Sequence, residues 1–346
     1  MTSAVYEGIL KWRSRGIDNT IKAEQKKLNK IGKFLQDRDV NLIVLVARGS
    51  SDNAALFGRY LLETVCGIPV SLAAPSVYTL YKSKVNLDRA LVVGVSQSGE
   101  GSDINAVLSQ AKKYGAFTLG ITNNSRSAIT KIADETLRIH AGKERSVAAT
   151  KTYTGQMLHF YLLANALAET KRKIALEKIP QFADEALLLR PQIAEIAARY
   201  IFMENCVVVG RGLNYGNSFE WALKLMETCY VVAERFSSAD FFHGPLAIVE
   251  RKFPMLMFAP NGVTKKSNID LLKRLKDLNA DSFSITNDKR IAKLSTRSLM
   301  MSPEIDEYLS PIPFVIPAQL FVALLSKAKG LDPDTPRSLS KVTKTL

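Results

Sequence analysis

The chain has 346 residues, of which 47% are hydrophobic and 8% aromatic, and its formal net charge is +14. The length and composition are typical of a globular protein with more than one domain, and no uninterrupted apolar run has the length of a membrane span. Basic residues are spread along the chain without a nucleic-acid motif, so we expect no nucleic-acid or membrane partner and a basic surface that attracts small anions.

Short apolar runs alternate with helical patterns through the first half. A helical pattern covers 23–36, and the apolar run 41–46 ends at a Gly-Ser-Ser turn before the helical pattern 52–65. A short apolar run between turns is typical of a buried parallel strand. The same alternation predicts further strands at 68–70, 90–95, 117–122 and 136–140, and helices at 103–114 and 150–168.

The second half repeats this order after a charged helical connector. Glu63 corresponds to Glu227 and Ile121 to Ile285, with the same offset in both pairs (227 − 63 = 285 − 121). A constant offset of this size indicates two copies of one domain. Strands are predicted at 205–210, 255–259 and 282–286, and helices at 215–229, 270–278 and 318–327.

The predicted fold class is therefore α/β, with two tandem domains that are each a doubly wound parallel sheet flanked by helices. The expected organisation is a helical segment at 1–38, a first domain at 39–169, a connector at 170–199, a second domain at 200–328 and a tail at 329–346.

A cluster of polar side chains follows the strand at 90–95. Ser96, Gln97, Ser98 and Ser102 supply hydroxyl and amide donors between the strand and the next helix. Backbone N–H groups at a helix start favour an anion, and ligands of such sheets bind beyond the carboxyl ends of the strands. A capped helix start is the alternative, but four side-chain donors exceed what a cap needs. We predict a phosphate site.

Neighbouring turns extend this prediction. Ser50 and Ser51 follow the adjacent strand and are expected to close the same pocket. The second repeat has Pro260, Asn261 and Gly262 at the corresponding turn and lacks the serine cluster. We therefore expect one phosphate pocket per chain, in the first repeat.

Several motifs together resemble sugar isomerase (SIS) domains, specifically the isomerase part of glucosamine-6-phosphate synthase and the SIS-type glucosamine-6-phosphate deaminases. The resemblance covers essentially 30–346. It is carried by the stretches 47–51 (ARGSS), 96–100 (SQSGE), 144–151 (ERSVAATK), 220–227 (EWALKLME), 243–247 (HGPLA) and 336–341 (PRSLSK).

The resemblance implies roles for particular residues. Glu227 matches the proton shuttle, His243 matches a histidine that assists ring opening in the neighbouring subunit's site, and Lys341 matches a lysine on the tail that closes over the sugar. It also implies sugar contacts from Glu144, Val147, Ala148 and Lys224. The sequence departs from the family pattern at Arg48, where a cysteine is usual.

The residues themselves support part of this assignment. One helix face carries Glu220, Lys224 and Glu227, at spacings of four and three and among apolar neighbours. These neighbours indicate a partly buried helix, where charges are costly and therefore suggest a function. A loop histidine such as His243, followed by Gly-Pro, suits acid–base work. We expect structural roles for His140 and His159.

The predicted reaction is deamination of glucosamine-6-phosphate with water to fructose-6-phosphate and ammonia, because the chain has no room for the synthase's glutaminase domain before the first strand. The alternatives are a deglycase for fructosamine-6-phosphate, a galactosamine-6-phosphate deaminase, an ammonia-dependent isomerase and a non-catalytic sugar-phosphate sensor. We expect no metal or redox cofactor, because proton transfers suffice. We also expect a homodimer, a cytoplasmic location without a signal peptide, and no disulfide among Cys66, Cys206 and Cys229.

Overall fold

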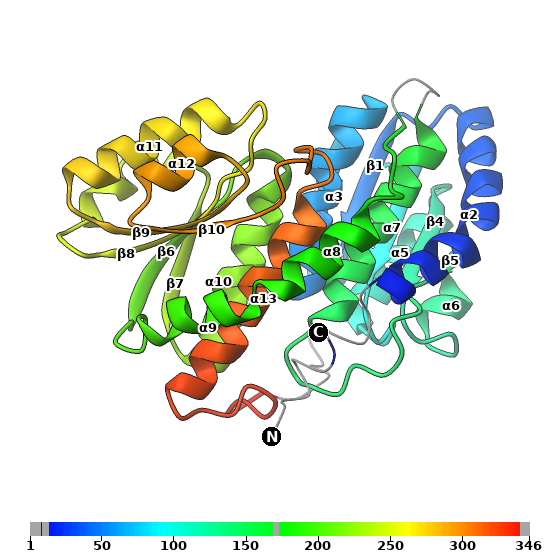
Figure 1. Cartoon of the computed structure of the whole chain (residues 1–346). Helices are drawn as coiled ribbons and strands as arrows, with labels where there is room; N and C mark the ends of the chain where they lie inside the picture. The colour runs from blue at the N-terminus through cyan, green and yellow to red at the C-terminus, as the bar shows by residue number, and fades with distance from the viewer. Residues whose placement is uncertain (1–7, 9–13, 169–172, 340–346) are drawn as a thin grey trace. The chain divides into compact units, whose positions relative to one another are not determined.

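The structure is a computed structural model that describes residues 8, 14–168 and 173–339. The described residues form two compact units. The first-repeat unit contains 15–144, 151–168 and 173–175, and the second-repeat unit contains 8, 14, 145–150 and 176–339. Each unit has one five-stranded sheet with helices on its faces (Figure 1).

The sheet of the first-repeat unit is entirely parallel, with strand order β2-β1-β3-β4-β5. All six residues of its central strand β3 (Ala90–Val95) are buried, as expected for a strand covered on both faces. The remaining elements are β1 (Leu42–Val46), β2 (Val70–Leu72), β4 (Phe117–Thr122), β5 (Glu135–Arg138), α2 (Ser14–Asp37), α3 (Ser50–Cys66), α4 (Pro75–Thr79), α5 (Ser102–Lys113), α6 (Ile129–Ile132) and α7 (Lys151–Leu167).

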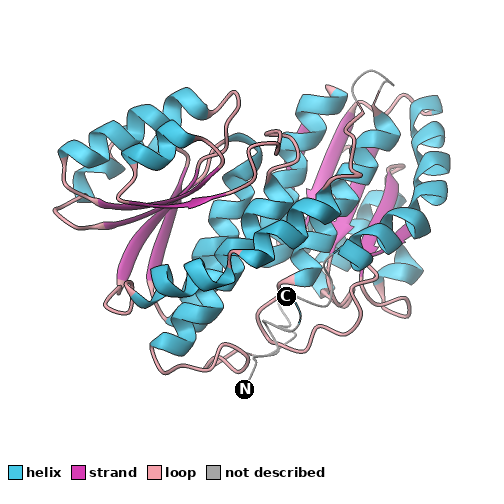
Figure 2. Cartoon of the chain, in the orientation of Figure 1, coloured by secondary structure: helices cyan, strands magenta, loops and turns pink. Residues whose placement is uncertain are grey.

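The sheet of the second-repeat unit has the same topology, β7-β6-β8-β9-β10, and is also parallel. Its helices cover both faces of the sheet (Figure 2). Its strands are β6 (Asn205–Val209), β7 (Val232–Phe236), β8 (Pro254–Phe258), β9 (Asp281–Thr286) and β10 (Arg297–Met300); its helices are α8 (Ile179–Leu188), α9 (Arg190–Ala198), α10 (Tyr215–Cys229), α11 (Lys265–Asp277), α12 (Lys289–Leu294), α13 (Pro311–Ala328) and the 3₁₀ turns η2 (Gly212–Asn214), η3 (Asp240–Phe242) and η4 (Pro245–Ile248).

The predicted α/β class and the two parallel sheets are confirmed. The connector expected at 170–199 is different in the structure, because its helices α8 and α9 pack on α13 and belong to the second-repeat unit. The amphipathic edge strands β7 and β10 escaped prediction because they are only half buried and lack a continuous apolar run.

Helix α13 begins before the predicted helix, at Pro311 instead of 318. Prolines 311, 313 and 317 masked it in the sequence, since proline interrupts helical hydrogen bonding, but the first two occupy the opening turn. By length and composition α13 could cross a membrane, although no single apolar run predicted one. It is 83% buried, which identifies it as the core helix of its unit.

The strand order places two loops of each unit at the same edge. β1 pairs with both β2 and β3, so the chain leaves in opposite directions from the carboxyl ends of β1 and β3. β6 and β8 have the same relationship in the second-repeat unit. Ligands of open α/β sheets bind at this switch in strand order. Each unit therefore has one candidate edge.

Candidate functional site

The turn after β3 is built around its serines. Gly99 N–H donates to Ser96 Oγ at 3.0 Å and Glu100 N–H donates to Ser98 Oγ at 3.3 Å. A hydroxyl that accepts from the backbone keeps its own proton for a second partner. Ser96, Gln97 and Ser98 are buried or half-buried, so the turn is fixed with its donors ready for an anion.

Glycine is required within this turn. Gly99 has φ +70, and a Cβ placed on it would collide with Ser127 Oγ. Its carbonyl accepts from Ile129 N–H at 3.0 Å and from the Asn105 amide at 3.3 Å, which holds the turn against α5 and α6. Ser102 is the exposed first residue of α5.

The neighbouring loop after β1 adds a positive charge that the sequence alone did not assign to the site. Arg48 Nε lies 2.6 Å from Asp103 Oδ2 at the start of α5, and Asp103 is buried while Arg48 stays half exposed. This pair joins the loops after β1 and β3. Ser50 begins α3, and Ser51 Oγ accepts from Gln156 at 2.9 Å. The structure thus brings both predicted serine loops to one edge of the sheet.

The stretch at 144–148 is divided between the units. Glu144, in the first-repeat unit, is buried and its Oε2 accepts from Thr152 N–H and Oγ1 at 3.1 and 2.9 Å. Val147 and Ala148 belong to the second-repeat unit, where Val147 N–H donates to Asp334 O at 3.4 Å. Glu144 therefore stabilises the start of α7, and its predicted sugar contact stays a prediction.

Helix α10 carries three charges in the second-repeat unit. Lys224 Nζ lies 2.5 Å from Glu227 Oε2 and 3.6 Å from Glu220 Oε1. The Glu220 side chain is fully buried and that of Lys224 is 4% exposed, but Glu227 is 22% exposed. The row of charges therefore ends in a carboxylate that solvent or a ligand can reach.

The two carboxylates keep Lys224 charged. Desolvation alone would lower the pKa of Lys224, but the charges of Glu220 and Glu227 outweigh it and hold the pKa above its ordinary value. The ammonium beside Glu227 fixes the position of this carboxylate. A general base must be held in position in this way.

The segment before the C-terminus contacts the end of α10. Tyr230 directly follows the last residue of α10 and has a left-handed conformation with φ 55. Arg337 N–H donates to the Tyr230 hydroxyl at 3.0 Å, and the Arg337 guanidinium stacks over the Tyr230 ring at 4.0 Å. These contacts hold Arg337 beside Tyr230, which follows Glu227 by three positions in the sequence. Lys341 lies outside the described residues.

His243 lies in an exposed turn between the short 3₁₀ segments η3 and η4, as its Gly-Pro sequel predicts. The other two histidines have structural contacts: His140 Nε2 lies 2.6 Å from Glu24, and His159 is fully buried between carbonyls of 155 and 138. Burial lowers the pKa of His159. Among the described residues, no group of three or more His, Cys, Asp or Glu side chains could hold a metal ion.

The two repeats differ at corresponding positions of α3 and α10. The repeat offset pairs Glu220, Lys224 and Glu227 with Leu56, Tyr60 and Glu63. Glu63 Oε1 accepts from Val70 N–H at 3.1 Å, which stabilises β2, and its one ion pair in the described part of the chain, with Arg59 at 3.5 Å, is partly exposed. The buried charges are therefore specific to the second repeat, and the serine turn to the first.

Comparisons with known proteins agree with this architecture. The SIS domain family model matches residues 38–166 and 203–326. This chain belongs to the SIS domain family. The glutamine–fructose-6-phosphate aminotransferase (isomerizing) of Pyrococcus horikoshii is 34% identical over 333 residues, which cover 94% of this chain and 55% of that protein. The chain spans about half the length of the curated relatives it matches.

Solved structures show the same fold across nearly the whole chain. The C-terminal domain of glucosamine-fructose-6-phosphate aminotransferase from Francisella tularensis has a TM-score of 0.88 and 26% identity, covering 97% of this chain and 99% of that chain. A glucosamine-6-phosphate deaminase from Thermotoga maritima has a TM-score of 0.71 at 22% identity, covering 95% and 99%. The second likeness shows the fold alone.

Proposed function

We propose that the chain converts glucosamine-6-phosphate and water to fructose-6-phosphate and ammonia. The observation that carries the proposal is Glu227, a reachable carboxylate held by the buried, charged Lys224 on the same helix, α10. The fold and the names of the SIS relatives support a phosphorylated sugar as substrate.

The chemistry balances with proton transfers and one water. In the open-chain amino aldose, Glu227 takes the proton from C2 and returns it to C1. The carbonyl oxygen on C1 gains a proton to become a hydroxyl, and the amino nitrogen on C2 loses one to become an imine, so the number of protons is conserved. Water adds to this imine, and ammonia leaves as the C2 ketone forms. Ring opening before these steps needs an acid, for which we propose His243.

The remaining groups have binding roles in the proposal. The serine turn and Arg48 would hold the 6-phosphate, because hydroxyl donors, a helix start and a guanidinium all favour a dianion. Lys341 would close over the sugar. The exposed His243 would act in the site of a second copy of the chain. This role requires a homodimer, which stays a prediction. The cytoplasmic location also stays a prediction.

A panel assay tests the reaction. It follows ammonia and ketose-phosphate formation from glucosamine-, galactosamine- and N-acetylglucosamine-6-phosphates and from fructosamine-6-phosphate. We expect ammonia and fructose-6-phosphate from glucosamine-6-phosphate. Turnover of another compound alone would make that compound the substrate in place of glucosamine-6-phosphate. Binding without any turnover would favour the non-catalytic sensor.

Paired variants test the proton shuttle. Glu227→Gln should lower kcat by about 10²- to 10⁴-fold with little change in KM, because the amide keeps the shape but cannot accept the proton. Glu63→Gln is the matched control, since it makes the same change at the corresponding position of the first repeat and should retain turnover. Equal activity of Glu227→Gln and Glu63→Gln would refute the assignment.

A further inference from the structure

The turn after β8 corresponds to the serine turn. The repeat offset aligns 96–102 with 260–266, and both turns lead from a central strand into a helix, α5 or α11. Both also lie at the edge where the strand order reverses. The second-repeat unit therefore keeps the backbone arrangement that attracts an anion, although it lacks the serines.

An anion already occupies this turn: the carboxylate of Glu307, which lies in the loop between β10 and α13. Glu307 accepts hydrogen bonds from Val263 N–H and, at 2.7 Å, from Thr264 Oγ1. The Glu307 residue is only 6% exposed. Gly262 has φ 151, and a Cβ placed on it would collide with Glu307 Oε2, so the turn closes directly on the carboxylate.

The first repeat has a lysine at the aligned position and uses the adjacent glutamate elsewhere. The repeat offset aligns Glu307 with Lys143, next to Glu144, which lies in the corresponding loop between β5 and α7. Oε2 of Glu144 accepts from Thr152 at the start of α7. Glu307 instead binds the strand–helix turn. An acidic residue of this loop thus stabilises a helix start in the first repeat and fills an anion turn in the second.

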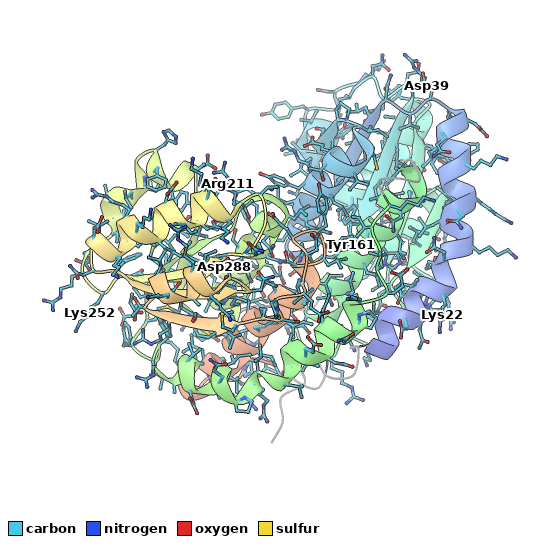
Figure 3. The ribbon with its side chains drawn as sticks, turned by 45° about the horizontal axis from the view of Figure 1, so that its top comes forward. Lys22, Asp39, Tyr161, Arg211, Lys252 and Asp288 are labelled. Atoms are coloured by element: carbon cyan, nitrogen blue, oxygen red, sulfur yellow. The ribbon has the colours of Figure 1, made fainter. Side chains whose placement is uncertain are left out.

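The surroundings of the second turn are basic. A cavity of about 470 Å³ beside Gly262 and Val263 is also lined by Lys265, Lys266, Lys273 and Arg290, with Asp270 as its single acidic residue. Lys265 pairs with Asp288, labelled in Figure 3, at 2.5 Å. Three further cations remain against one carboxylate. This excess of positive charge would attract a phosphate to the turn.

Asn268 provides a second, independent sign of a polar ligand. It is fully buried on α11, and within the described part of the chain neither its amide oxygen nor its nitrogen has a hydrogen-bond partner. Asn268 follows Thr264 by four positions and so shares its helix face, and helical side chains lean toward the preceding turn. Burial of an amide without a hydrogen-bond partner costs free energy, which a polar ligand close to this turn would recover.

We propose that the second repeat contains a latent phosphate site, blocked by the chain's own Glu307 carboxylate. A tethered carboxylate is always at high local concentration, so it excludes a free anion from the same donors. Glu307 thereby limits the chain to one phosphorylated ligand. Removal of this side chain should open the turn to inorganic phosphate or a phosphomonoester.

Equilibrium dialysis with radiolabelled inorganic phosphate measures the stoichiometry. The full chain should bind one phosphate, and Glu307→Ala should bind two. Glu307→Gln fills the same volume and should still bind one. Glu304→Ala is the matched control in the same loop, where Glu304 forms an exposed pair with Lys178, and it should also bind one. A folded Glu307→Ala that binds no more phosphate than Glu304→Ala overturns the proposal.

A second background separates this inference from the proposed function. Ser98→Glu introduces a carboxylate into the first turn and should abolish phosphate binding, and Glu307→Ala added to it should restore one phosphate. If the wild type binds none and Glu307→Ala binds one, the first-repeat phosphate site fails but the latent site stands. If the wild type and Glu307→Ala each bind one phosphate, and the Ser98→Glu, Glu307→Ala double variant binds none, the latent site is refuted.

Thermal unfolding tests the proposal even if Glu307→Ala is less stable than the wild type, because it compares the shift that phosphate causes in each protein. Glu307→Ala loses two hydrogen bonds and should unfold at a lower temperature in chloride than the wild type. Phosphate should raise its midpoint more than it raises the midpoints of Glu307→Gln and Glu304→Ala, because a bound ligand stabilises the folded state. An equal rise in all three proteins contradicts the proposal.

Discussion

Replacement of Lys224 by methionine should strongly destabilise the second-repeat unit. Methionine keeps most of the hydrocarbon chain but removes the ammonium that lies 3.6 Å from Glu220. At this distance the attraction is about 5 kcal/mol for an effective dielectric constant of about 20. Because Glu220 is fully buried, it cannot regain water in exchange. Loss of one partner from a buried ion pair typically costs about 3–5 kcal/mol, which we expect here.

Urea unfolding at pH 7 measures this cost. Trp221 is adjacent to Glu220 in α10 and only 1% exposed, so its fluorescence reports on the affected helix. A Trp12→Phe background isolates this signal. Lys178→Met is the matched control, because the Lys178–Glu304 pair is mostly exposed, and it should cost no more than about 1 kcal/mol.

A double variant separates charge from packing. Glu220→Leu with Lys224→Met removes both charges and should recover most of the lost stability, since apolar residues can replace a buried ion pair. Leucine already stands at the corresponding Leu56. The reasoning is refuted if Lys224→Met costs no more than Lys178→Met, or if the double variant is no more stable than Lys224→Met. The double variant should in either case lack turnover, because Lys224 positions Glu227.

Two further predictions concern the first-repeat unit. Ser98→Ala should raise KM for the sugar phosphate about tenfold at nearly unchanged kcat, as measured by steady-state kinetics, because it removes a donor to the phosphate; an unchanged KM would exclude this contact. Desolvation alone would raise the pKa of Asp134, but hydrogen bonds from Lys112 and Thr118 outweigh it and hold the pKa below 3.8. The contribution of Asp134 to stability is therefore present above pH 3.8 and is lost as the pH falls through the folded-state pKa. Asp134→Asn should therefore lower the thermal midpoint at pH 7 but progressively less below pH 3.8, and a gap that widens in acid would contradict this cause.

The buried parts of the fold were predictable because their physics is local. β3 and its counterpart β8 are continuous apolar runs bounded by turns, which only a covered parallel strand explains well. The edge strand β10 has no such run, since it borders one neighbour and keeps partly exposed residues. The start of α13 was hidden by prolines that its opening turn tolerates.

The candidate site was predictable where the residue types themselves carry the chemistry. The serine cluster and the spacing of Glu220, Lys224 and Glu227 are visible in the sequence. The roles of Arg48 and Glu307 are not, because each depends on a partner far along the chain: Asp103 in one case and the turn at 262–264 in the other. A signal for Glu307 did exist, since the first repeat has Glu144 within one position of the aligned site, but an acidic residue in a loop predicts no partner by itself.

The repeats have diverged in complementary ways, and the buried donors explain why. A strand–helix turn exposes N–H groups that must be paired with water, a ligand or the protein itself. The first repeat keeps its turn ordered with serine hydroxyls that still have protons to donate. The second repeat satisfies its turn with Glu307, and the charges of its helix α10 form the group for which we propose acid–base chemistry. Closure of the second turn thus follows from the same requirement that leaves the first one open to the proposed phosphate, and Glu307→Ala should open the second turn to an anion as well.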